Sequence, residues 1–248
     1  SSVTAMKLTF LFFDMATIFV LFLLLKFFER SLAWALLYAW HPLTVIEFAG
    51  SGHGDAVAIF FLMLGIYFVV RARSVWSGVL LSLSFSAKFV AVIFLPFVED
   101  MRSRWKTNTI ILASFAAVAL MAYYPFLDAG AYVFAGLKEY AGNWEFNSSL
   151  YAPLYDYLQK YFANDPATNL FWGWGTDDKA RTAAKFILFA AGLCFFIGLW
   201  VHHIRKNYDS QKENFLHAVY LLLGALTLLN PTAHPWYIVW VVPFCTPL

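Results

Sequence analysis

Apolar runs of membrane-spanning length recur from one end of the chain to the other, with short polar stretches between them. A helix needs roughly 20 apolar residues to cross the hydrocarbon core of a bilayer. The pattern predicts eight apolar segments, at about 8–28, 32–49, 56–70, 76–98, 108–127, 183–201, 214–230 and 236–248. We therefore expect an all-α, polytopic membrane helix bundle that forms a single transmembrane domain over 1–248.

Basic residues cluster in four of the connections, and this bias orients the segments. The clusters are Lys26 with Arg30, Arg71 with Arg73, Arg102 with Arg104 and Lys106, and Arg205 with Lys206 and Lys212. Lysine and arginine are enriched in cytoplasmic loops, so all four clusters are predicted to lie on the cytoplasmic side.

Segment 76–98 conflicts with this rule if it crosses the membrane once, because the clusters before and after it would face opposite sides. A break at Ala87–Lys88 removes the conflict. The halves would be about 18 and 15 Å long as helices, against a hydrocarbon core of about 30 Å. The sequence thus favours a re-entrant helical hairpin near 76–98 with Lys88 at its apex. An ordinary span with a snorkelling lysine is the alternative.

This arrangement turns three connections toward the extracytoplasmic side: 47–55, 128–182 and 230–237. Polar residues within them are expected to converge with Lys88 on one site, namely Glu47, His53, Asp55 and His234. Asp55 also stands at the start of an apolar segment, where a helix N-cap is the alternative role.

The connection 128–182 is too long to be a passive link. It predicts an extracytoplasmic loop with two short amphipathic helices, near 131–141 and 150–163. Its aromatic side chains could lie on the bilayer, stack on a sugar or cover an isoprenoid tail; they are Tyr132, Tyr140, Trp144, Tyr151, Tyr155, Tyr157, Trp172 and Trp174. An interfacial helix pair without a ligand remains open.

Composition agrees with a lipid environment. Hydrophobic residues make up 61% of the chain and charged residues 13%, against about 25% charged residues in soluble domains. The net charge of +2 gives no indication of nucleic-acid binding. Cys194 and Cys245 both fall inside apolar segments, so no disulfide framework is implied.

Four stretches carry a resemblance to a known superfamily. The block HPLTVIEFAGSGHGDAVAIFFLMLGIYF resembles a characteristic block of GT-C glycosyltransferases, in particular the polyprenyl-phosphate mannosyltransferases of family 87 and its neighbours. Three further stretches match in order: SAKFVAVIFLPF, NWEFNSSLYAPL and HPWYIVWVVPF. The resemblance covers essentially the whole chain.

The resemblance implies an integral-membrane glycosyltransferase of a prokaryotic plasma membrane. It would move a hexose, with mannose expected, from a polyprenyl-phosphate donor to a lipid, glycan or protein acceptor outside the cytoplasm, with inversion. Within this chain Asp55, and after it Glu47, would be the substitute for the family's catalytic carboxylate. Lys88, His234 and His53 would bind the donor phosphate, and the sugar or acceptor would contact Trp144, Asn147, Trp236 and Tyr237.

One departure keeps other classes open. In the superfamily the catalytic aspartate lies in the first extracytoplasmic loop, and the resemblance puts that loop, with the helix before it, ahead of Ser1. A transporter and a non-catalytic membrane subunit of a larger complex are therefore alternatives. The sequence requires no metal and leaves a divalent cation open as a cofactor.

Overall fold

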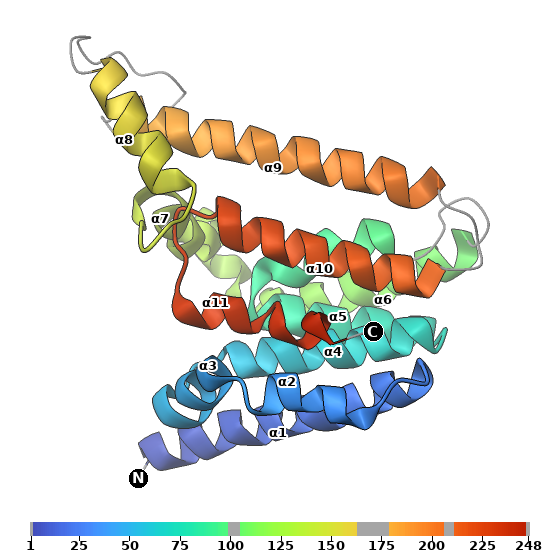
Figure 1. Ribbon diagram of the computed structural model, residues 1–248. Helices are drawn as coiled ribbons and strands as arrows, with labels where there is room; N and C mark the ends of the chain where they lie inside the picture. The colour runs from blue at the N-terminus through green and yellow to red at the C-terminus, as the bar shows by residue number, and fades with distance from the viewer. Residues whose placement is uncertain (1, 99–104, 163–178, 206–210, 247–248) are drawn as a thin grey trace.

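The computed structural model describes residues 2–98, 105–162, 179–205 and 211–246, and every described element is helical (Figure 1). The elements are α1 (Ser2–Phe27), η1 (Leu32–Ala35), α2 (Leu36–Ala39), α3 (Pro42–Thr44), the π-helix η2 (Val45–Ser51), α4 (Asp55–Val70), α5 (Ser74–Ala87), η3 (Phe89–Phe97), α6 (Trp105–Tyr123), η4 (Tyr124–Phe134), α7 (Ala135–Asn143), α8 (Tyr151–Phe162), α9 (Lys179–Arg205), α10 (Gln211–Leu229), α11 (Pro235–Val239) and η6 (Val242–Cys245). The remaining η elements are 3-10 helices.

The long helices run side by side, and the short ones α3, α7, α8 and α11 gather at one end of the bundle (Figure 1). We call this the loop end. Basic side chains meet at the opposite end, where Lys212 lies 4.7 Å from the ring centre of Phe27 and Arg30 pairs with Glu213 at 3.8 Å. The described basic clusters thus share one end of the bundle, as predicted. Arg102, Arg104 and Lys206 lie outside the described residues.

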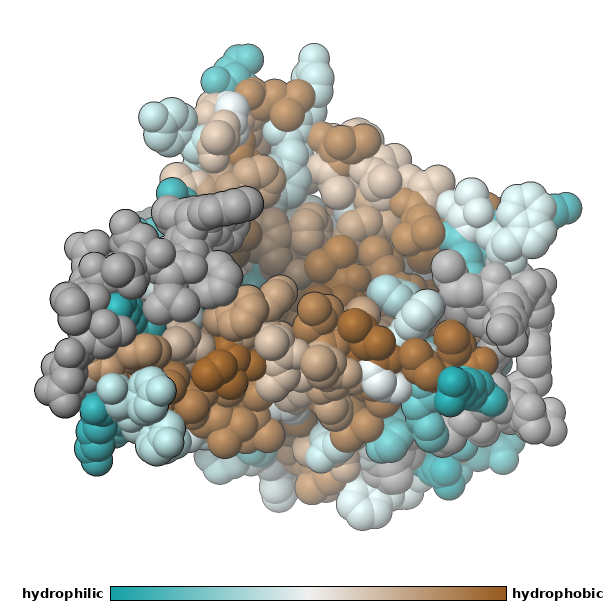
Figure 2. Space-filling view, turned by 90° about the horizontal axis from the view of Figure 1, so that it is seen from above, coloured by the Kyte–Doolittle hydropathy of each residue, from teal (hydrophilic) through white to brown (hydrophobic). Residues whose placement is uncertain are grey.

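Among the described residues, three helical stretches are long and apolar enough to cross a membrane: Ser2–Phe27, Trp105–Asn143 and Lys179–Arg205. The protein is therefore an integral membrane protein. Large apolar side chains cover the outer surface of these helices, among them Phe12, Phe19, Leu120, Phe189 and Leu193. The face turned upward in Figure 1, on which α9 lies, is largely apolar and is hollowed near its centre (Figure 2). Such a surface suits lipid tails.

The sequence suggested one continuous apolar segment at 32–49, but the structure shows that this segment is bent. The helical pieces Leu32–Ala39 and Pro42–Ser51 meet at an angle of 55° and count as a fourth span only if they are taken together. The bend falls at His41, whose backbone is extended (φ −64°, ψ 124°). The ring of a proline disfavours the α conformation in the residue before it, so Pro42 accounts for the break.

Segment 76–98 breaks at Lys88, as predicted. Lys88 is extended (φ −159°, ψ 130°) between α5 and η3. Phe89, at the start of η3, stacks on Tyr123 at the end of α6, whereas Phe97 meets His203 near the far end of α9. The chain therefore turns back at Lys88, and α6 then runs parallel to α5. The predicted reversal of the chain at Lys88 is confirmed.

The last apolar segment, 236–248, does not form one helix. It is divided into α11 and η6, each only four or five residues long. Its side chains Val239, Trp240, Val242 and Phe244 are buried in the bundle. A continuous run of apolar residues predicted a span here, but such a run equally fits a short segment enclosed by protein on all sides.

Seven hydroxyl side chains on the helices bond to the helix that carries them. Each donates to the carbonyl four residues earlier: Thr9 to Ala5, Thr17 to Phe13, Ser77 to Arg73, Ser86 to Ser82, Thr109 to Trp105, Ser114 to Ile110 and Thr227 to Leu223. Lipid offers no hydrogen-bond partner, so this back-bonding lets polar side chains occupy apolar helices.

A glycine sets the distance between α5 and α6. A Cβ added at Gly78 would lie 2.0 Å from Ser114 Oγ and 2.3 Å from the carbonyl oxygen of Ile111. Small residues allow close helix contact in membranes, where burying apolar surface against a neighbouring helix gives little advantage over lipid. Gly78 therefore fixes the hairpin against α6, and with it the position of Lys88.

Candidate active site

Lys88 and Asp55 form an ion pair near the loop end of the bundle. Nζ of Lys88 lies 2.6 Å from Oδ1 of Asp55, and the same oxygen accepts a hydrogen bond from Nε1 of Trp240 at 2.8 Å. The Asp55 side chain is 10% exposed and that of Lys88 is 29% exposed. The carboxylate supplies the counter-charge that an ammonium group needs at this depth.

Helix lengths bring the two residues together. Asp55 is the first residue of α4 and Lys88 directly follows α5, and these antiparallel helices of 16 and 14 residues are joined by a short turn. Their far ends must therefore lie side by side. Gly54 occupies the N-cap position of α4, and no side chain caps the helix. The N-cap role considered for Asp55 is wrong.

An irregular stretch precedes Asp55. The π-helix η2 ends at Gly52, whose φ of 77° lies in the left-handed region that glycine tolerates. A Cβ there would meet the Cγ of Lys7 at 3.0 Å, and Nζ of Lys7 bonds to the carbonyl of Gly50 at 2.6 Å. π-helical turns are frequent at functional sites. The stretch aims His53 and Asp55 toward the interior of the loop end.

A cavity of about 580 Å³ opens beside the ion pair. Polar and aromatic side chains from four segments line one part of it, namely His53, Asp55, Lys88, Tyr140, Trp144, Asn230, His234, Trp236, Tyr237 and Trp240. Apolar side chains of η3, α7 and α10 line another part, including Phe89, Val90, Leu137, Leu223 and Leu226. A small number of polar groups in a mainly apolar pocket is the usual character of a ligand site.

Four rings form a column along the loop end. Trp236 lies between His53 and His234, with ring centres 3.8 and 4.3 Å away, and His234 also stacks on Phe146 at 4.9 Å. Burial and the nearby charges of Lys88 and His53 lower the pKa of His234 below its ordinary value. His234 is therefore neutral at neutral pH and acts as a hydrogen-bonding group rather than a fixed cation.

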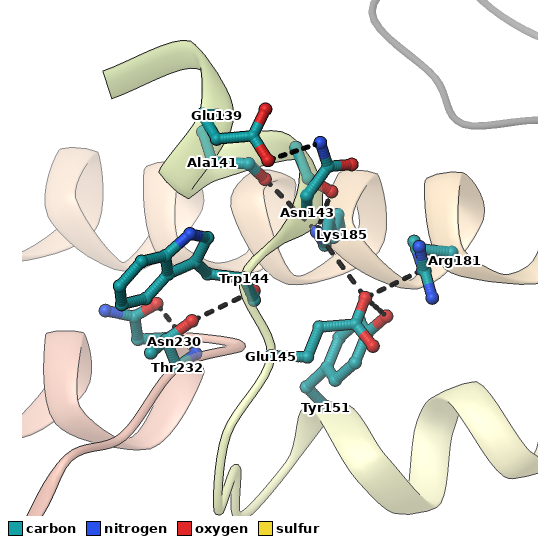
Figure 3. Close-up of polar contacts among 11 residues, drawn as sticks. Glu139, Ala141, Asn143, Trp144, Glu145, Tyr151, Arg181, Lys185, Asn230 and Thr232 are labelled. Atoms are coloured by element: carbon teal, nitrogen blue, oxygen red, sulfur yellow. Dashed lines mark hydrogen bonds and ion pairs between the residues drawn. The ribbon is translucent and has the colours of Figure 1, made fainter. Parts of the chain in front are cut away.

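Glu145 ties the large loop to α9. Its Oε1 lies 2.9 Å from Nε of Arg181 and 3.5 Å from Nζ of Lys185, and it also accepts a hydrogen bond from Tyr151 (Figure 3). Lys185 in turn donates to the carbonyl of Ala141 at 3.1 Å. These contacts hold the segment between α7 and α8 against the first turns of α9.

A second set of contacts joins the same segment to the connection after α10. Oγ1 of Thr232 donates to the carbonyl of Trp144 at 2.9 Å (Figure 3). Phe146 exchanges backbone hydrogen bonds with this connection, accepting from Ala233 at 2.7 Å and donating to Pro231 at 3.1 Å. Trp144 is thus held at the wall of the cavity from both sides.

Seven of the nine residues singled out from the sequence line this cavity: Asp55, Lys88, His53, His234, Trp144, Trp236 and Tyr237. Glu47 lies one step away, with Oε2 at 3.1 Å from Nε2 of His53. Asn147 is outside the lining, in an exposed turn with a φ of 47°. Sequence reasoning missed Asn230 and Trp240, and it named Tyr140 only among the loop aromatics that could contact the bilayer, a sugar or an isoprenoid tail.

No group of three or more His, Cys, Asp or Glu side chains suited to a metal ion occurs among the described residues. The ionic chemistry that the described cavity wall offers is that of one carboxylate, one ammonium group and two imidazoles.

Comparison with known proteins adds a family. Residues 1–104 match the model of the MptA/B family, described as alpha-(1->6)-mannopyranosyltransferase, N-terminal domain. The match covers 104 of the 248 residues, and the matched family is one of GT-C mannosyltransferases. A mannosyltransferase domain implies a glycosyltransferase, and its bounds include Asp55 and Lys88. No curated protein and no solved structure matches the chain.

Proposed function

We propose that the protein transfers mannose from a polyprenyl-phosphate donor to an acceptor hydroxyl, with inversion, in the cavity beside Asp55 and Lys88. The observation that carries this proposal is the 2.6 Å contact between Lys88 Nζ and Asp55 Oδ1 at the apex of a broken membrane helix, inside a mannosyltransferase family domain. An ion pair that borders an open cavity in a membrane protein is a candidate functional site by default.

Asp55 is suited to the role of base. Both of its described hydrogen bonds, from Lys88 and Trp240, go to Oδ1. Within the described part of the chain no donor reaches Oδ2, so this oxygen is available to an acceptor hydroxyl. A general base must come within hydrogen-bond distance of the proton that it removes. Glu47 faces His53 instead and is the weaker candidate.

Lys88 is suited to the leaving group. In the reaction the acceptor oxygen bonds to C1 of the sugar, the bond from C1 to the phosphate oxygen breaks, and the hydroxyl proton moves to Asp55. The electron pair of the broken bond stays on the polyprenyl phosphate. Asp55 thereby loses its charge as the phosphate gains charge, so the attraction of Lys88 shifts from the carboxylate to the leaving group. Such stabilisation acts mainly in the transition state.

The two linings of the cavity suit the two parts of the donor. Leu223 and Leu226 of α10, with Phe89 and Val90 of η3, offer an apolar wall for the isoprenoid chain. Trp144 and Trp236 offer aromatic faces on the polar side, where a sugar ring can stack. The imidazoles of His53 and His234 can hydrogen-bond to the phosphate. Asn147 remains a predicted contact of the acceptor.

The loop end is proposed to face the extracytoplasmic side of a prokaryotic plasma membrane, because the basic residues gather at the other end. Segment 128–182, with α7 and α8, would then be an extracytoplasmic loop closing over the cavity. A lipid, a glycan or a protein that bears a mannose or another free hydroxyl would be the acceptor, and other membrane subunits could join the assembly.

The test is a transfer assay with the purified protein in lipid nanodiscs. Polyprenyl-phosphate mannose, labelled in the sugar, is supplied with an alkyl α-mannoside, and the product is analysed for its linkage and anomeric configuration. The proposal expects an α-linked mannoside, which is inversion if the donor is β-linked. Binding of the donor without transfer by the full-length protein would favour a non-catalytic subunit, and vectorial movement of the donor would favour a transporter.

A further inference from the structure

Three hydrogen-bonded side chains form one wall of the cavity. Nδ2 of Asn230 donates to the phenol oxygen of Tyr140 at 3.1 Å, and that oxygen lies 3.1 Å from the phenol oxygen of Tyr237. Asn230 follows α10, Tyr140 belongs to α7 and Tyr237 belongs to α11. The row therefore connects three segments that are far apart in the sequence, and all three side chains line the cavity.

The protons in this row have a preferred direction. Oδ1 of Asn230 accepts from the backbone N–H of Thr232 at 3.1 Å (Figure 3). This bond fixes the amide so that Nδ2 faces Tyr140. Tyr140 accepts that bond, and either phenol could be the donor in the contact between Tyr140 and Tyr237. The direction in which each bond strengthens the next has the O–H of Tyr140 donate to Tyr237. One proton then remains. The O–H of Tyr237 has no acceptor among the described residues.

The ring that carries this O–H lies close to the cation of the site. Nζ of Lys88 sits 4.2 Å from the centre of the Tyr237 ring, and Asp55 holds it there. An anion that contacts the ammonium group is therefore beside the phenol. A hydroxyl that donates to a charged oxygen makes a short bond, about twice as strong as one between neutral groups.

We propose that Tyr237 donates its free O–H to a non-bridging phosphate oxygen of the polyprenyl-phosphate donor, and that Asn230 and Tyr140 are positioning residues that direct this proton. The inference rests on the proposed function, because it takes the donor phosphate as the anion beside Lys88. It gives Tyr237 a role at the phosphate rather than at the sugar or acceptor.

Two variants test the direction of the row. Tyr237→Phe removes the donor and keeps the ring over Lys88. Asn230→Asp keeps the shape and can still accept from Thr232, but its second oxygen accepts from Tyr140 instead of donating. The proton of Tyr140 then points to Asp, and Tyr237 must donate to Tyr140. When the direction of the row is reversed, the O–H of Tyr237 is engaged with Tyr140 and cannot donate to the phosphate.

The experiment measures equilibrium binding of two probes to the protein in nanodiscs, a short-chain prenyl phosphate and its mannosyl ester. We expect Tyr237→Phe and Asn230→Asp each to raise the Kd of both probes by about tenfold or more, the scale of one hydrogen bond to a charged group. The double variant should bind no more weakly than the weaker single variant. Tyr157→Phe, at a 67% exposed position on α8, is the matched control and should bind as the wild type does.

Each remaining outcome has a definite meaning. Unchanged affinity of Tyr237→Phe, with the wild type binding both probes, overturns the inference and leaves the proposed function in place. A loss confined to the mannosyl ester overturns the phosphate assignment. Losses from the two substitutions that simply add in the double variant overturn the directed row. Failure of the wild type to bind either probe overturns both the inference and the proposed function.

Discussion

Lys88 Nζ lies 2.6 Å from Asp55 Oδ1, and 33 residues separate the two along the chain. From the sequence, Lys88 was expected to bind the donor phosphate. The structure instead pairs the ammonium with a carboxylate of the same protein. The lysine is therefore tolerated in this bundle without a ligand, and a phosphate would compete with Asp55 for it.

The ion pair predicts non-additive effects on stability. Asp55→Asn and Lys88→Met should each lower the melting temperature in detergent. The first leaves the ammonium group of Lys88 without its counter-charge and the second leaves the carboxylate of Asp55 without its counter-charge, at a cost of a few kcal/mol or less. The double variant should melt closer to the wild type than the sum of the two losses implies. Losses that add in the double variant would show that the two side chains do not interact.

The same substitution in Asp55 separates folding from chemistry. Asn retains an oxygen that can accept from Lys88 and Trp240, but it cannot take a proton. Mannosyl transfer by Asp55→Asn should fall by about a hundredfold or more, the range for a lost general base. Glu47→Gln is the matched control, with a much smaller loss expected. Wild-type transfer by Asp55→Asn would assign the base to another residue.

Close packing at Gly78 predicts a local stability effect. Gly78→Ala places a Cβ against Ser114 Oγ and the backbone of Ile111, so α5 and α6 must move apart. The melting temperature should fall. In Gly198→Ala the added Cβ meets nothing within 4 Å, and alanine favours the helix by about 1 kcal/mol. Equal melting of the two variants would contradict the proposed packing.

The contacts of Glu145 predict a change in substrate binding. Glu145→Gln removes the charge that holds Arg181 and Lys185 together, so the segment carrying Trp144 should loosen from α9. We expect a several-fold higher KM for the donor with little change in kcat. Glu139→Gln is the control, because the bond that Glu139 makes within the described part of the chain is to Asn143, on the exposed side of α7. A fall in kcat alone would instead place Glu145 in the chemical step.

The topology is tested by cysteine labelling. The most natural position from the sequence, Asn164, lies outside the described residues, and Lys160 near the end of α8 is an exposed substitute. With Cys194 and Cys245 replaced by alanine, Lys160→Cys should react with an impermeant thiol reagent in intact cells. Lys106→Cys should react only after permeabilisation. The reverse result would place the loop end on the cytoplasmic side.

Much of this fold could be predicted from simple rules. Segment length and the basic clusters located the break at Lys88, because both are local properties of the chain. The bend at His41 was missed although Pro42 signals it, since the apolar run continues through both residues. The segment 236–248 was misjudged because apolarity alone does not distinguish contact with lipid from burial in protein.

The residues of the site could be predicted from the sequence better than the contacts between them. Rare polar residues at helix ends pointed to Asp55, Lys88 and His234. The pairing of Asp55 with Lys88 depends on how α4 packs on α5. The similar lengths of these two helices were the feature of the sequence that could have indicated it. Nothing in the sequence distinguished Trp240 or Tyr140 from their aromatic neighbours. A tryptophan in an apolar run is typical of the protein core, and a tyrosine in a loop is typical of the membrane interface.

The most direct test of the central claim is the rate of mannosyl transfer by Lys88→Met, which keeps most of the apolar stem and removes the cation. The account predicts a hundredfold or greater loss in protein that elutes as a monodisperse species, with partial recovery in Lys88→Arg, because a guanidinium is larger and differently shaped than the ammonium. Transfer by Lys88→Met at the wild-type rate would contradict it, and the donor phosphate would then have to bind elsewhere.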